Sequence, residues 1–421
     1  MRILFYGINY YPELTGIGKY SGEVCEWLAS RGHEVEVITA MPYYPAWQIK
    51  EDYKSKWWHT EIINGVTVHR CPLYVPSNVT ALKRILLETS FVLSSLLYWL
   101  KIIFSTKFDA VICVCPPFQL GLLPYFYKKL RGVPFVYHIQ DLQVDMVNDL
   151  GMIKNKKAIK VLFWIEKFIM NGATVISSIS EGMIKKIKNK NLKVDKYLLF
   201  PNWVDTVSIK PLTTNESLRE QMGYQIDDII VQYSGTIAEK QGLEMIIEVA
   251  KDLPLIQFMM VGEGGFKQKM IKKVEDAKLK NIRFFPLQPY NKLSNLLVTG
   301  DIHLVLQKKS ASDLVLPSKL TSILSAGAFA IVTASEGTSL HEIITIHNTG
   351  IVVEPESYKA LKDGIIKYSK ENTSTYKNNS RIYAQKYLDR EKILLSFEKY
   401  LLNNIATIYL IAVVFSDLNH K

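Results

Sequence analysis

The sequence predicts an α/β protein built from two doubly wound, Rossmann-like domains that face a cleft. Three observations lead to this prediction. The chain has 421 residues, enough for two complete cores, and it is 48% hydrophobic and 22% charged, as globular proteins are. Short apolar segments of strand length alternate with longer segments of helical pattern through both halves of the chain.

The first half has the pattern of buried parallel strands joined by helical crossovers. We expect strands at residues 2–7, 34–39, 66–70, 110–114, 134–139 and 173–177, and helices at 18–31, 85–104, 120–130 and 158–170. Residues 1–200 are therefore predicted to form an N-terminal domain.

The pattern breaks at Pro201 and restarts after a polar stretch. The second half repeats the scheme, with strands expected at 229–234, 257–261, 282–285, 302–306 and 329–333, and helices at 242–252, 265–277, 291–298 and 318–326. Residues 201–380 form the predicted C-terminal domain. A helix is expected at 382–402, followed by a tail at 405–421 whose apolar run is too short to span a bilayer as a helix.

The net charge is +11, because 51 Lys and Arg residues outnumber 40 Asp and Glu residues. This excess favours phosphorylated ligands or an anionic membrane surface. Nucleic acid is the weaker option, since the sequence has neither a basic stripe with interleaved aromatic residues nor a zinc-finger spacing.

Cysteine usage and the N-terminus favour a cytoplasmic protein. The four cysteines are too few for a disulfide framework, and Cys113 and Cys115 lie in one apolar run as buried strand residues would. The chain starts with a short strand that runs into Gly7, without the pattern of a signal peptide.

Residues 85–104 are almost all apolar and about as long as a bilayer span. Glu88 interrupts the run, so we expect a helix that packs on the first domain rather than a transmembrane helix. One face would lie on the membrane beside Lys83, Arg84 and Lys101.

A Pro-Ser-Lys sequence opens the helix expected near residue 318. Pro317 suits the first turn of a helix, whose unpaired N–H groups and positive dipole end attract anions. Ser318 and Lys319 add a hydroxyl and a positive charge, so the segment is interpreted as a diphosphate seat. The alternative is an ordinary capped surface helix.

Gly16 and Gly18 follow the first strand and let the backbone approach a phosphate. The spacing differs from Gly-x-Gly-x-x-Gly and no Gly-Lys-Ser follows, which argues against nicotinamide binding and ATP hydrolysis. A tight strand-to-helix turn is the alternative interpretation.

His138 and Asp141 leave a strand at the edge of the sheet where ligands bind. There they could orient a sugar hydroxyl or stabilise a developing positive charge. The alternative is a buried structural histidine followed by an aspartate that caps the next segment.

The second domain has three further candidate segments. Gly235 and Thr236 precede Lys240 in its first turn, where amides and one cation could contact a phosphate. A second glycine-rich turn contains Glu263, and Lys308 and Lys309 precede the Pro-Ser-Lys segment. Packing glycines and solvated lysines are the alternative.

Together these motifs resemble one family. The segments Tyr10 to Tyr20, His138 to Asp141, Ser234 to Glu244 and Leu316 to Thr321 are similar to those of retaining GT-B glycosyltransferases of family 4. Within that family they resemble the bacterial colanic-acid and O-antigen glycosyltransferases, some of which are L-fucosamine transferases. The resemblance covers about residues 1 to 400.

The resemblance implies a UDP- or GDP-linked sugar bound mainly to the second domain and a lipid-linked saccharide acceptor held by the first. It implies no obligatory metal or other cofactor, a helix at 381–404 that returns to the first domain, and a place at the inner face of the plasma membrane. The diphosphate leaves as the acceptor hydroxyl enters on the same side, with retention. The implied catalytic residues are His138, Asp141, Lys240 and Lys319, and the implied donor-binding residues are Gly16, Gly18, Gly235, Thr236, Glu263, Lys308, Ser318, Leu320 and Ser322.

The chain departs from the family pattern at two places. The family usually has a pair of glutamates eight positions apart, of which the second binds the nucleotide ribose. In this chain the matching positions are Leu314 and Ser322. Thr236 stands where an arginine is usual, which shifts phosphate charge onto Lys240 and Lys319. Two other functions stay open at this point: a UDP-sugar 2-epimerase of the same fold, and a non-catalytic nucleotide-sugar-binding partner.

Overall fold

The computed structural model describes residues 1–13, 16–78, 80–149, 151, 153, 155–309 and 317–406, and the side chains of Ala81, Lys240 and Ala406 lie outside this description. The chain divides into two compact units. Unit 1 contains Met1–Pro201 and the chain from Leu394 onward, and unit 2 contains Asn202–Ile393. The division after Pro201 falls one residue beyond the boundary expected from the sequence.

Unit 1 is built on an eight-stranded sheet in the order β3-β4-β2-β1-β5-β6-β7-β8. All neighbouring strands are parallel except the β3–β4 pair. The strands are β1 (Arg2–Tyr6), β2 (Glu34–Ala40), β3 (His59–Ile63), β4 (Val66–Cys71), β5 (Ala110–Cys115), β6 (Phe135–Ile139), β7 (Val175–Ser178) and β8 (Tyr197–Leu199). The order reverses between β1 and β5, and such switch points are where doubly wound sheets bind ligands.

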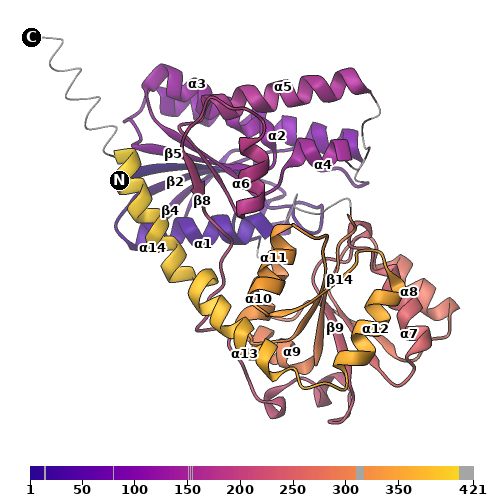
Figure 1. The fold of residues 1–421 in the computed structure, drawn as a ribbon. Helices are drawn as coiled ribbons and strands as arrows, with labels where there is room; N and C mark the ends of the chain where they lie inside the picture. The colour runs from indigo at the N-terminus through magenta and orange to yellow at the C-terminus, as the bar shows by residue number, and fades with distance from the viewer. Residues whose placement is uncertain are drawn as a thin grey trace, which may run out of the picture. The chain divides into compact units, whose positions relative to one another are not determined.

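Helices cover both faces of this sheet (Figure 1). They are α1 (Gly16–Ser30), α2 (Ala81–Ile103), α3 (Leu122–Arg131), α4 (Gln143–Asp149), α5 (Lys156–Gly172) and α6 (Glu181–Lys188). Helices α2, α3 and α5 form one layer, and α1 lies on the opposite face together with the part of α14 (Arg390–Leu401) that belongs to unit 1. Side-chain caps from Thr80, Asn155 and Ser180 begin α2, α5 and α6.

Helix α2 is a packed helix of the domain. Its residues Leu87, Phe91, Trp99 and Ile102 are buried, and Ser95 hydrogen-bonds the Tyr6 hydroxyl of β1 at 2.8 Å. By length and composition, Leu82–Ile103 could also cross a membrane, with 33% of its most apolar window buried. The buried residues of α2 agree with the expectation of a helix that packs on the first domain.

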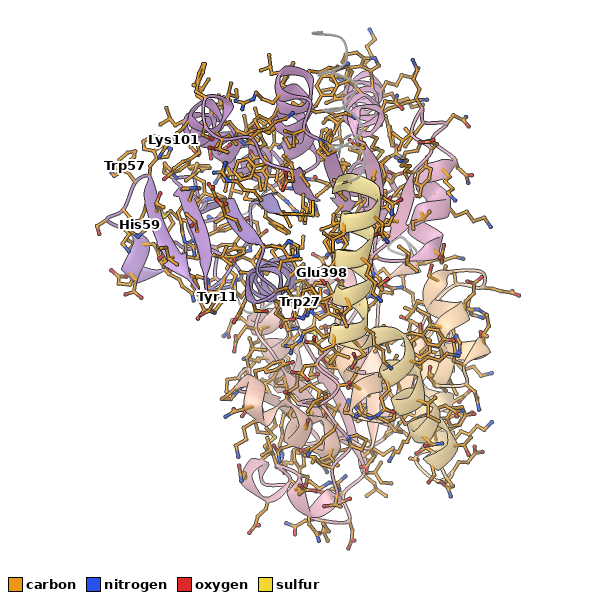
Figure 2. The ribbon with its side chains drawn as sticks, turned by 90° about the vertical axis from the view of Figure 1, so that its left-hand side faces the viewer. Tyr11, Trp27, Trp57, His59, Lys101 and Glu398 are labelled. Carbon is orange, nitrogen blue, oxygen red and sulfur yellow. The ribbon has the colours of Figure 1, made fainter. Side chains whose placement is uncertain are left out.

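Helix α14 is joined to the end of α1 by one ion cluster in unit 1. Figure 2 labels Glu398 on α14, whose ribbon is pale yellow, and Trp27 on α1. The Glu398 carboxylate receives hydrogen bonds from the Arg31 guanidinium at 3.2 and 3.3 Å and pairs with His33 Nε2 at 2.9 Å. These partners lower the pKa of Glu398 although burial opposes the shift.

Unit 2 is built on a six-stranded, fully parallel sheet in the order β11-β10-β9-β12-β13-β14. Its strands are β9 (Ile230–Ser234), β10 (Gln257–Val261), β11 (Ile282–Phe285), β12 (Ile302–Val305), β13 (Ala330–Thr333) and β14 (Gly350–Val353). The order reverses between β9 and β12, the strands that lead to Gly235 and Lys308.

Two apolar clusters flank the unit 2 sheet. One joins the sheet to α7 (Glu244–Asp252), α8 (Lys267–Asp276) and α12 (Tyr358–Tyr368). The other joins it to α9 (Leu293–Thr299), α10 (Lys319–Ser325) and α11 (Ser339–Ile346). In Figure 1 the two groups of helices lie on opposite sides of the sheet.

The structure confirms every strand expected from the sequence, within two residues at each end. Strands β3, β8 and β14 and helices α4, α6, α11, α12 and α13 (Ser374–Tyr383) had not been predicted. The single helix expected at 382–402 was wrong: α13 passes into a π-helical turn, and Asp389 in an extended conformation (ψ 124°) separates this turn from α14. Of the expected tail at 405–421, residues 407–421 lie outside the described residues.

All four cysteines are free and buried, as expected for Cys113 and Cys115 in β5. Burial raises the pKa of both thiols. They are core residues of the sheet.

Candidate functional site

Two glycine-rich turns lie against each other at the carboxyl end of the unit 2 sheet. The Gly235 amide donates to the Val261 carbonyl at 2.9 Å, and the Ile237 amide donates to the Glu263 carbonyl at 2.9 Å. Gly262 has a φ of 153°, and a Cβ added there would lie 1.9 Å from the Gly235 carbonyl oxygen. The two turns can therefore be this close only because Gly262 has no side chain.

Replacing Gly262 with alanine is expected to destabilise unit 2 by about 3 kcal/mol or more, through the strained φ and the clash with the Gly235 carbonyl. Gly265→Ala is the matched control, because no atom lies within 4 Å of a Cβ added there. Denaturant unfolding of both variants measures the difference. Equal stability of the two would contradict the close approach of the turns.

Lys319 lies directly beside these turns. Its Nζ is 3.6 Å from the centroid of the Tyr233 ring, and a Cβ added at Gly235 would lie 3.2 Å from both Cε and Nζ. The buried Tyr233 donates its hydroxyl to the Thr236 carbonyl at 2.7 Å. A fixed cation thus meets the glycine turn at the switch point of the sheet, which suits a phosphate ligand.

The sequence predicts unpaired backbone N–H groups at the start of α10, but two of these amides are paired. The Leu320 amide donates to the Pro317 carbonyl at 3.0 Å, and the Thr321 amide donates to the Ser318 carbonyl at 3.3 Å. The helix has only seven residues. The positive charge of Lys319 is therefore the main feature here that attracts an anion, and the dipole is a smaller one.

The other residues expected to bind the donor differ in how far their side chains are exposed. Ser318 and Thr236 are exposed and Ser322 is half-buried. Leu320 is 3% exposed and belongs to an apolar core cluster, so its side chain packs the helix onto the sheet. The side chain of Lys240, an expected catalytic residue, lies outside the described residues, as does Leu314.

Glu263 and Lys308 are also placed at this end of the sheet. The exposed Glu263 carboxylate forms an ion pair with Lys267 at 2.7 Å on the first turn of α8. The Lys308 side chain follows β12, and a Cβ added at Gly242 would lie 3.6 Å from its Cγ. Glu263 therefore follows β10, the strand beside β9, whereas Lys308 follows β12, one of the two strands of the switch point.

In unit 1, His138 lies at the end of β6 and is 4% exposed. Its Nδ1 is 2.8 Å from the Ser177 hydroxyl, and its Nε2 is 2.9 Å from the Gln140 side-chain amide. Burial lowers the pKa of His138 to about 3. The imidazole is therefore neutral at physiological pH, with a protein partner at each nitrogen.

Acidification is expected to destabilise both units through buried histidines. Burial also lowers the pKa of His303, in β12, to about 4. Unfolded chains protonate histidine near pH 6.5, so the unfolded state binds more protons than the folded state as the pH falls below that value. The free energy of unfolding should decrease by up to about 1.4 kcal/mol per pH unit for each histidine.

Denaturant unfolding between pH 6.5 and 5 tests this, because most carboxylates titrate below that range. The slope against pH should be smaller in His138→Gln and in His303→Gln than in the original chain. If neither substitution changes the slope, the buried histidines are not the cause of the pH dependence.

Asp141 lies three residues after His138 and is half-buried. Its carbonyl accepts the Gln143 amide at 3.0 Å, at the start of α4, and its carboxylate contributes to the raised pKa of Arg84. Arg84 forms an ion pair with Glu88 at 3.0 Å on the first turns of α2. Asp141 thus lies near the guanidinium of Arg84 at the carboxyl end of the sheet.

Glu88 is the acidic residue within the apolar helix α2, and hydrogen bonds satisfy its buried carboxylate. It is 3% exposed, and its carboxylate accepts hydrogen bonds from Arg84, from Gln119 at 3.3 Å and from Gln143 at 3.0 Å. These partners come from the helix itself, from the turn after β5 and from α4. Glu88 therefore ties α2 to the loops around Asp141.

The turn that contains Gly16 and Gly18 is organised by Glu13, which the sequence-based reasoning missed. Glu13 Oε1 accepts the Tyr43 and Tyr44 amides at 2.9 and 2.8 Å, and Oε2 accepts the Asn9 side-chain amide at 2.8 Å. A Cβ added at Gly18 would lie 2.8 Å from Glu13 Cβ. Gly18 is therefore needed for close packing on Glu13, whereas Gly16 begins α1 with a φ of 58°.

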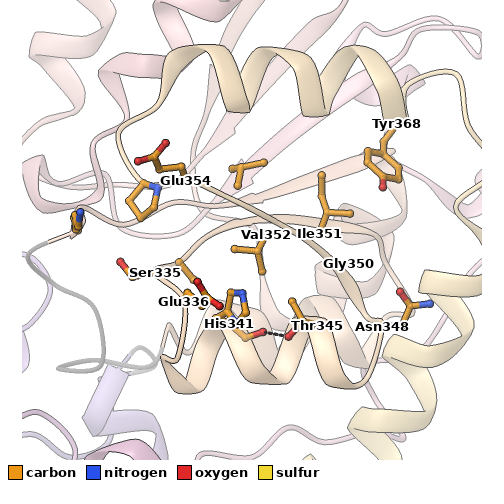
Figure 3. Close-up of a pocket in the computed structure, with 14 residues that line it drawn as sticks. Ser335, Glu336, His341, Thr345, Asn348, Gly350, Ile351, Val352, Glu354 and Tyr368 are labelled. Atoms are coloured by element: carbon orange, nitrogen blue, oxygen red, sulfur yellow. Dashed lines mark hydrogen bonds between the residues drawn. The ribbon is translucent and has the colours of Figure 1, made fainter.

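A cavity of about 780 Å³ lies along β14, the edge strand of unit 2, between α11 and α12 (Figure 3). Its lining includes Ser335, Glu336, His341, Glu354 and Tyr368. The residues expected to bind the donor do not line it, although Lys309, the neighbour of Lys308, does. The glycine turns and Lys319 therefore remain the candidate site of unit 2.

No group of three or more His, Cys, Asp or Glu residues suited to a metal ion occurs within the described ranges. Besides Glu13, sequence reasoning also missed Tyr233 as the partner of Lys319. A carboxylate next to a glycine turn, and a tyrosine at the end of a buried strand, were the available signals. Neither pattern is specific without the fold.

The chain is similar to known glycosyltransferases along almost its whole length. Residues 15–203 match the glycosyl transferase 4-like domain family, and residues 214–387 match the glycosyl transferases group 1 family. The Escherichia coli K12 protein WcaI, whose name assigns it as a glycosyl transferase of colanic acid biosynthesis, is 42% identical over 409 residues. The match covers 94% of this chain and 98% of WcaI.

Solved structures show the same fold at low sequence identity. Sucrose-phosphate synthase from Thermosynechococcus elongatus has a TM-score of 0.77 and 17% identity, over 96% of this chain and 99% of that protein. Anabaena HepE, solved with UDP and glucose, has a TM-score of 0.71 and 14% identity, over 96% of this chain and 100% of HepE. The chain therefore belongs to the glycosyltransferase 4-like and group 1 family of GT-B glycosyltransferases.

Proposed function

We propose that the protein transfers a sugar from a nucleotide-diphosphate sugar to a lipid-linked saccharide during synthesis of a bacterial surface polysaccharide. The juxtaposition of Lys319 with the Gly235 turn carries the proposal, since it offers a fixed cation and a close backbone approach to a diphosphate. The name of WcaI and the UDP bound by HepE support the same class of reaction. The nucleotide is UDP or GDP, and the sugar is of the N-acetyl-L-fucosamine or L-fucose type.

The reaction we propose retains the anomeric configuration. The bond between the anomeric carbon and the diphosphate oxygen breaks, and the acceptor hydroxyl oxygen forms the new bond on the same face. The departing phosphate takes the proton of that hydroxyl. Catalysis then depends mainly on stabilising the negative charge of the leaving diphosphate, which the Lys319 ammonium can do.

The expected roles of the remaining residues follow from this scheme. Lys240 and Lys308 add positive charge near the diphosphate, and Ser318 adds a hydroxyl. His138 and Asp141 belong to the unit that holds the acceptor, where they position the sugar. No metal ion or other cofactor is required in this scheme.

A panel of nucleotide sugars incubated with a purified lipid-linked N-acetylglucosamine acceptor tests the proposal. We expect one donor to give an extended lipid product, whose new linkage has the anomeric configuration of the donor by NMR. An epimerised or free sugar formed without acceptor would instead indicate a 2-epimerase. Nucleotide-sugar binding without any product would indicate a binding partner.

We further propose that the protein acts in the cytoplasm, bound peripherally to the inner face of the plasma membrane. The exposed leucines of α2 and the net charge of +11 support this location. Membranes washed with salt and then with detergent test it. Recovery of all the protein in a low-salt supernatant would contradict the proposal.

A further inference from the structure

The helical layer of α2, α3 and α5 presents charge of one sign to solvent. Its two acidic residues, Glu88 and Glu166, are 3% and 2% exposed, and they pair with Arg84 and Lys190. The basic residues of the three helices are Lys83, Arg84, Lys101, Lys128, Lys129, Arg131, Lys156, Lys157, Lys160 and Lys167. The layer therefore attracts anionic partners.

The same three helices expose large apolar side chains. Leu93 of α2 is 61% exposed, Phe126 of α3 is 53% exposed and Trp164 of α5 is 68% exposed. Next to α2, the Trp58 indole donates to the Ser94 carbonyl at 2.8 Å, and the exposed Trp57 stacks on Trp58. Exposed tryptophan and leucine among basic residues are typical of a surface that lies in the membrane interface.

Figure 2 shows Trp57 and Lys101 on one side of unit 1. Tryptophan side chains prefer the level of the lipid headgroups, and lysine adds attraction to anionic lipids. Nucleic acid would explain the lysines but would leave the exposed leucines without a partner.

A pocket of about 610 Å³ opens where α3 and α5 end, at the amino end of the unit 1 sheet. Its lining includes Tyr125, Lys128, Lys129, Phe168 and Lys193, and none of the residues that line it is acidic. Three lysines without a carboxylate among the lining residues form a site for an anion with several negative oxygens.

The Lys128 ammonium in this pocket has more N–H donors than the one hydrogen bond to a carbonyl uses. The Lys128 ammonium donates to the Gly172 carbonyl at 2.9 Å, and an ammonium carries three N–H donors. Burial lowers the pKa of Lys128, and the neighbouring Lys129 lowers it further. A bound phosphate would relieve this repulsion.

The pocket is continuous with the exposed apolar residues of α5. Phe168 lines the pocket, and its ring stacks on that of Trp164 at a centroid distance of 6.0 Å. A ligand phosphate held by the lysines would thus have apolar side chains beside it. This combination fits a lipid, whose phosphate and acyl chains are joined, better than a soluble phosphate.

We propose that the pocket around Lys128, Lys129 and Lys193 binds the phosphate of an anionic lipid headgroup, while the exposed apolar side chains of α2, α3 and α5 enter the membrane interface. The proposal rests on the membrane location proposed above and does not depend on which sugar is transferred. It gives the membrane-bound protein a defined lipid contact in place of diffuse attraction alone.

Co-sedimentation with vesicles tests the pocket. The full-length protein is mixed with vesicles of phosphatidylcholine alone or with added phosphatidylglycerol. We compare the pocket variant Lys129→Gln/Lys193→Gln with Lys157→Gln/Lys160→Gln, which removes the same charge from exposed positions of α5. Diffuse attraction gives about the same loss for both, because each lysine near an anionic membrane contributes a similar energy.

We expect the pocket variant to bind the anionic vesicles about tenfold more weakly than the matched variant, as a specific contact requires. Equal loss in the two variants would overturn the proposal. Tight binding of inorganic phosphate that the vesicles do not compete with would also overturn it, in favour of a soluble anion. Thermal unfolding of both variants checks that the fold is kept.

Glycosyl transfer separates this proposal from the proposed function. With an acceptor dispersed in detergent, the pocket variant should keep the rate of the original chain. A protein that shows the expected vesicle binding but transfers no sugar would contradict the enzyme function and leave the lipid site intact.

Discussion

Replacing Lys319 with alanine should lower kcat by about 10²- to 10³-fold, the range found when one group that stabilises a transition-state charge is removed. Its Nζ lies against the Gly235 turn and over the Tyr233 ring, where it can neutralise the charge that develops on the leaving diphosphate. The loss should be larger in kcat than in donor affinity, because that charge is greatest in the transition state.

Steady-state kinetics with the donor and acceptor found in the screen measure this effect. Lys272→Ala, at an exposed position of α8, is the control for loss of a positive charge elsewhere on unit 2. Both variants should unfold at nearly the temperature of the original chain. Unchanged kinetics in Lys319→Ala would show that Lys319 does not stabilise the leaving diphosphate.

The second large effect is expected for His138→Ala, with kcat reduced by about a hundredfold. His138 lies in unit 1 and is neutral, because burial lowers its pKa to about 3. We expect nucleotide affinity to change less than kcat, because the diphosphate site that we propose around Lys319 lies in unit 2. Isothermal titration with the nucleotide and turnover measurements give the two quantities.

Ser177→Ala is the matched variant for His138. It removes the hydroxyl that lies 2.8 Å from Nδ1 but keeps the imidazole. If the His138 imidazole contacts the transferred sugar, Ser177→Ala should lose less kcat than His138→Ala. Equal losses of kcat and nucleotide affinity in His138→Ala would instead indicate a histidine that only supports the fold, which its two protein partners also allow.

Much of the fold could be predicted because buried parallel strands carry a strong local signal. The run Ala110–Cys115 is buried at every position, and such runs separated by helices lead to a doubly wound sheet. The missed elements lack this signal. The strand β3 alternates partly buried and exposed residues at the sheet edge, and α13 forms from the polar segment Ser374–Tyr383 with one buried residue, Ser380.

The sequence by itself determined two Rossmann-like domains, the glycine turns and the family, because these depend on local patterns and on motif spacing. Tertiary structure decided the partners: Lys319 over Tyr233, Gly262 against the Gly235 carbonyl, and Glu13 under the Gly18 turn. It also decided that the start of α10 pairs its amides internally. These contacts join residues that are distant in the chain or depend on the exact turn geometry, and a one-dimensional pattern carries no information on either.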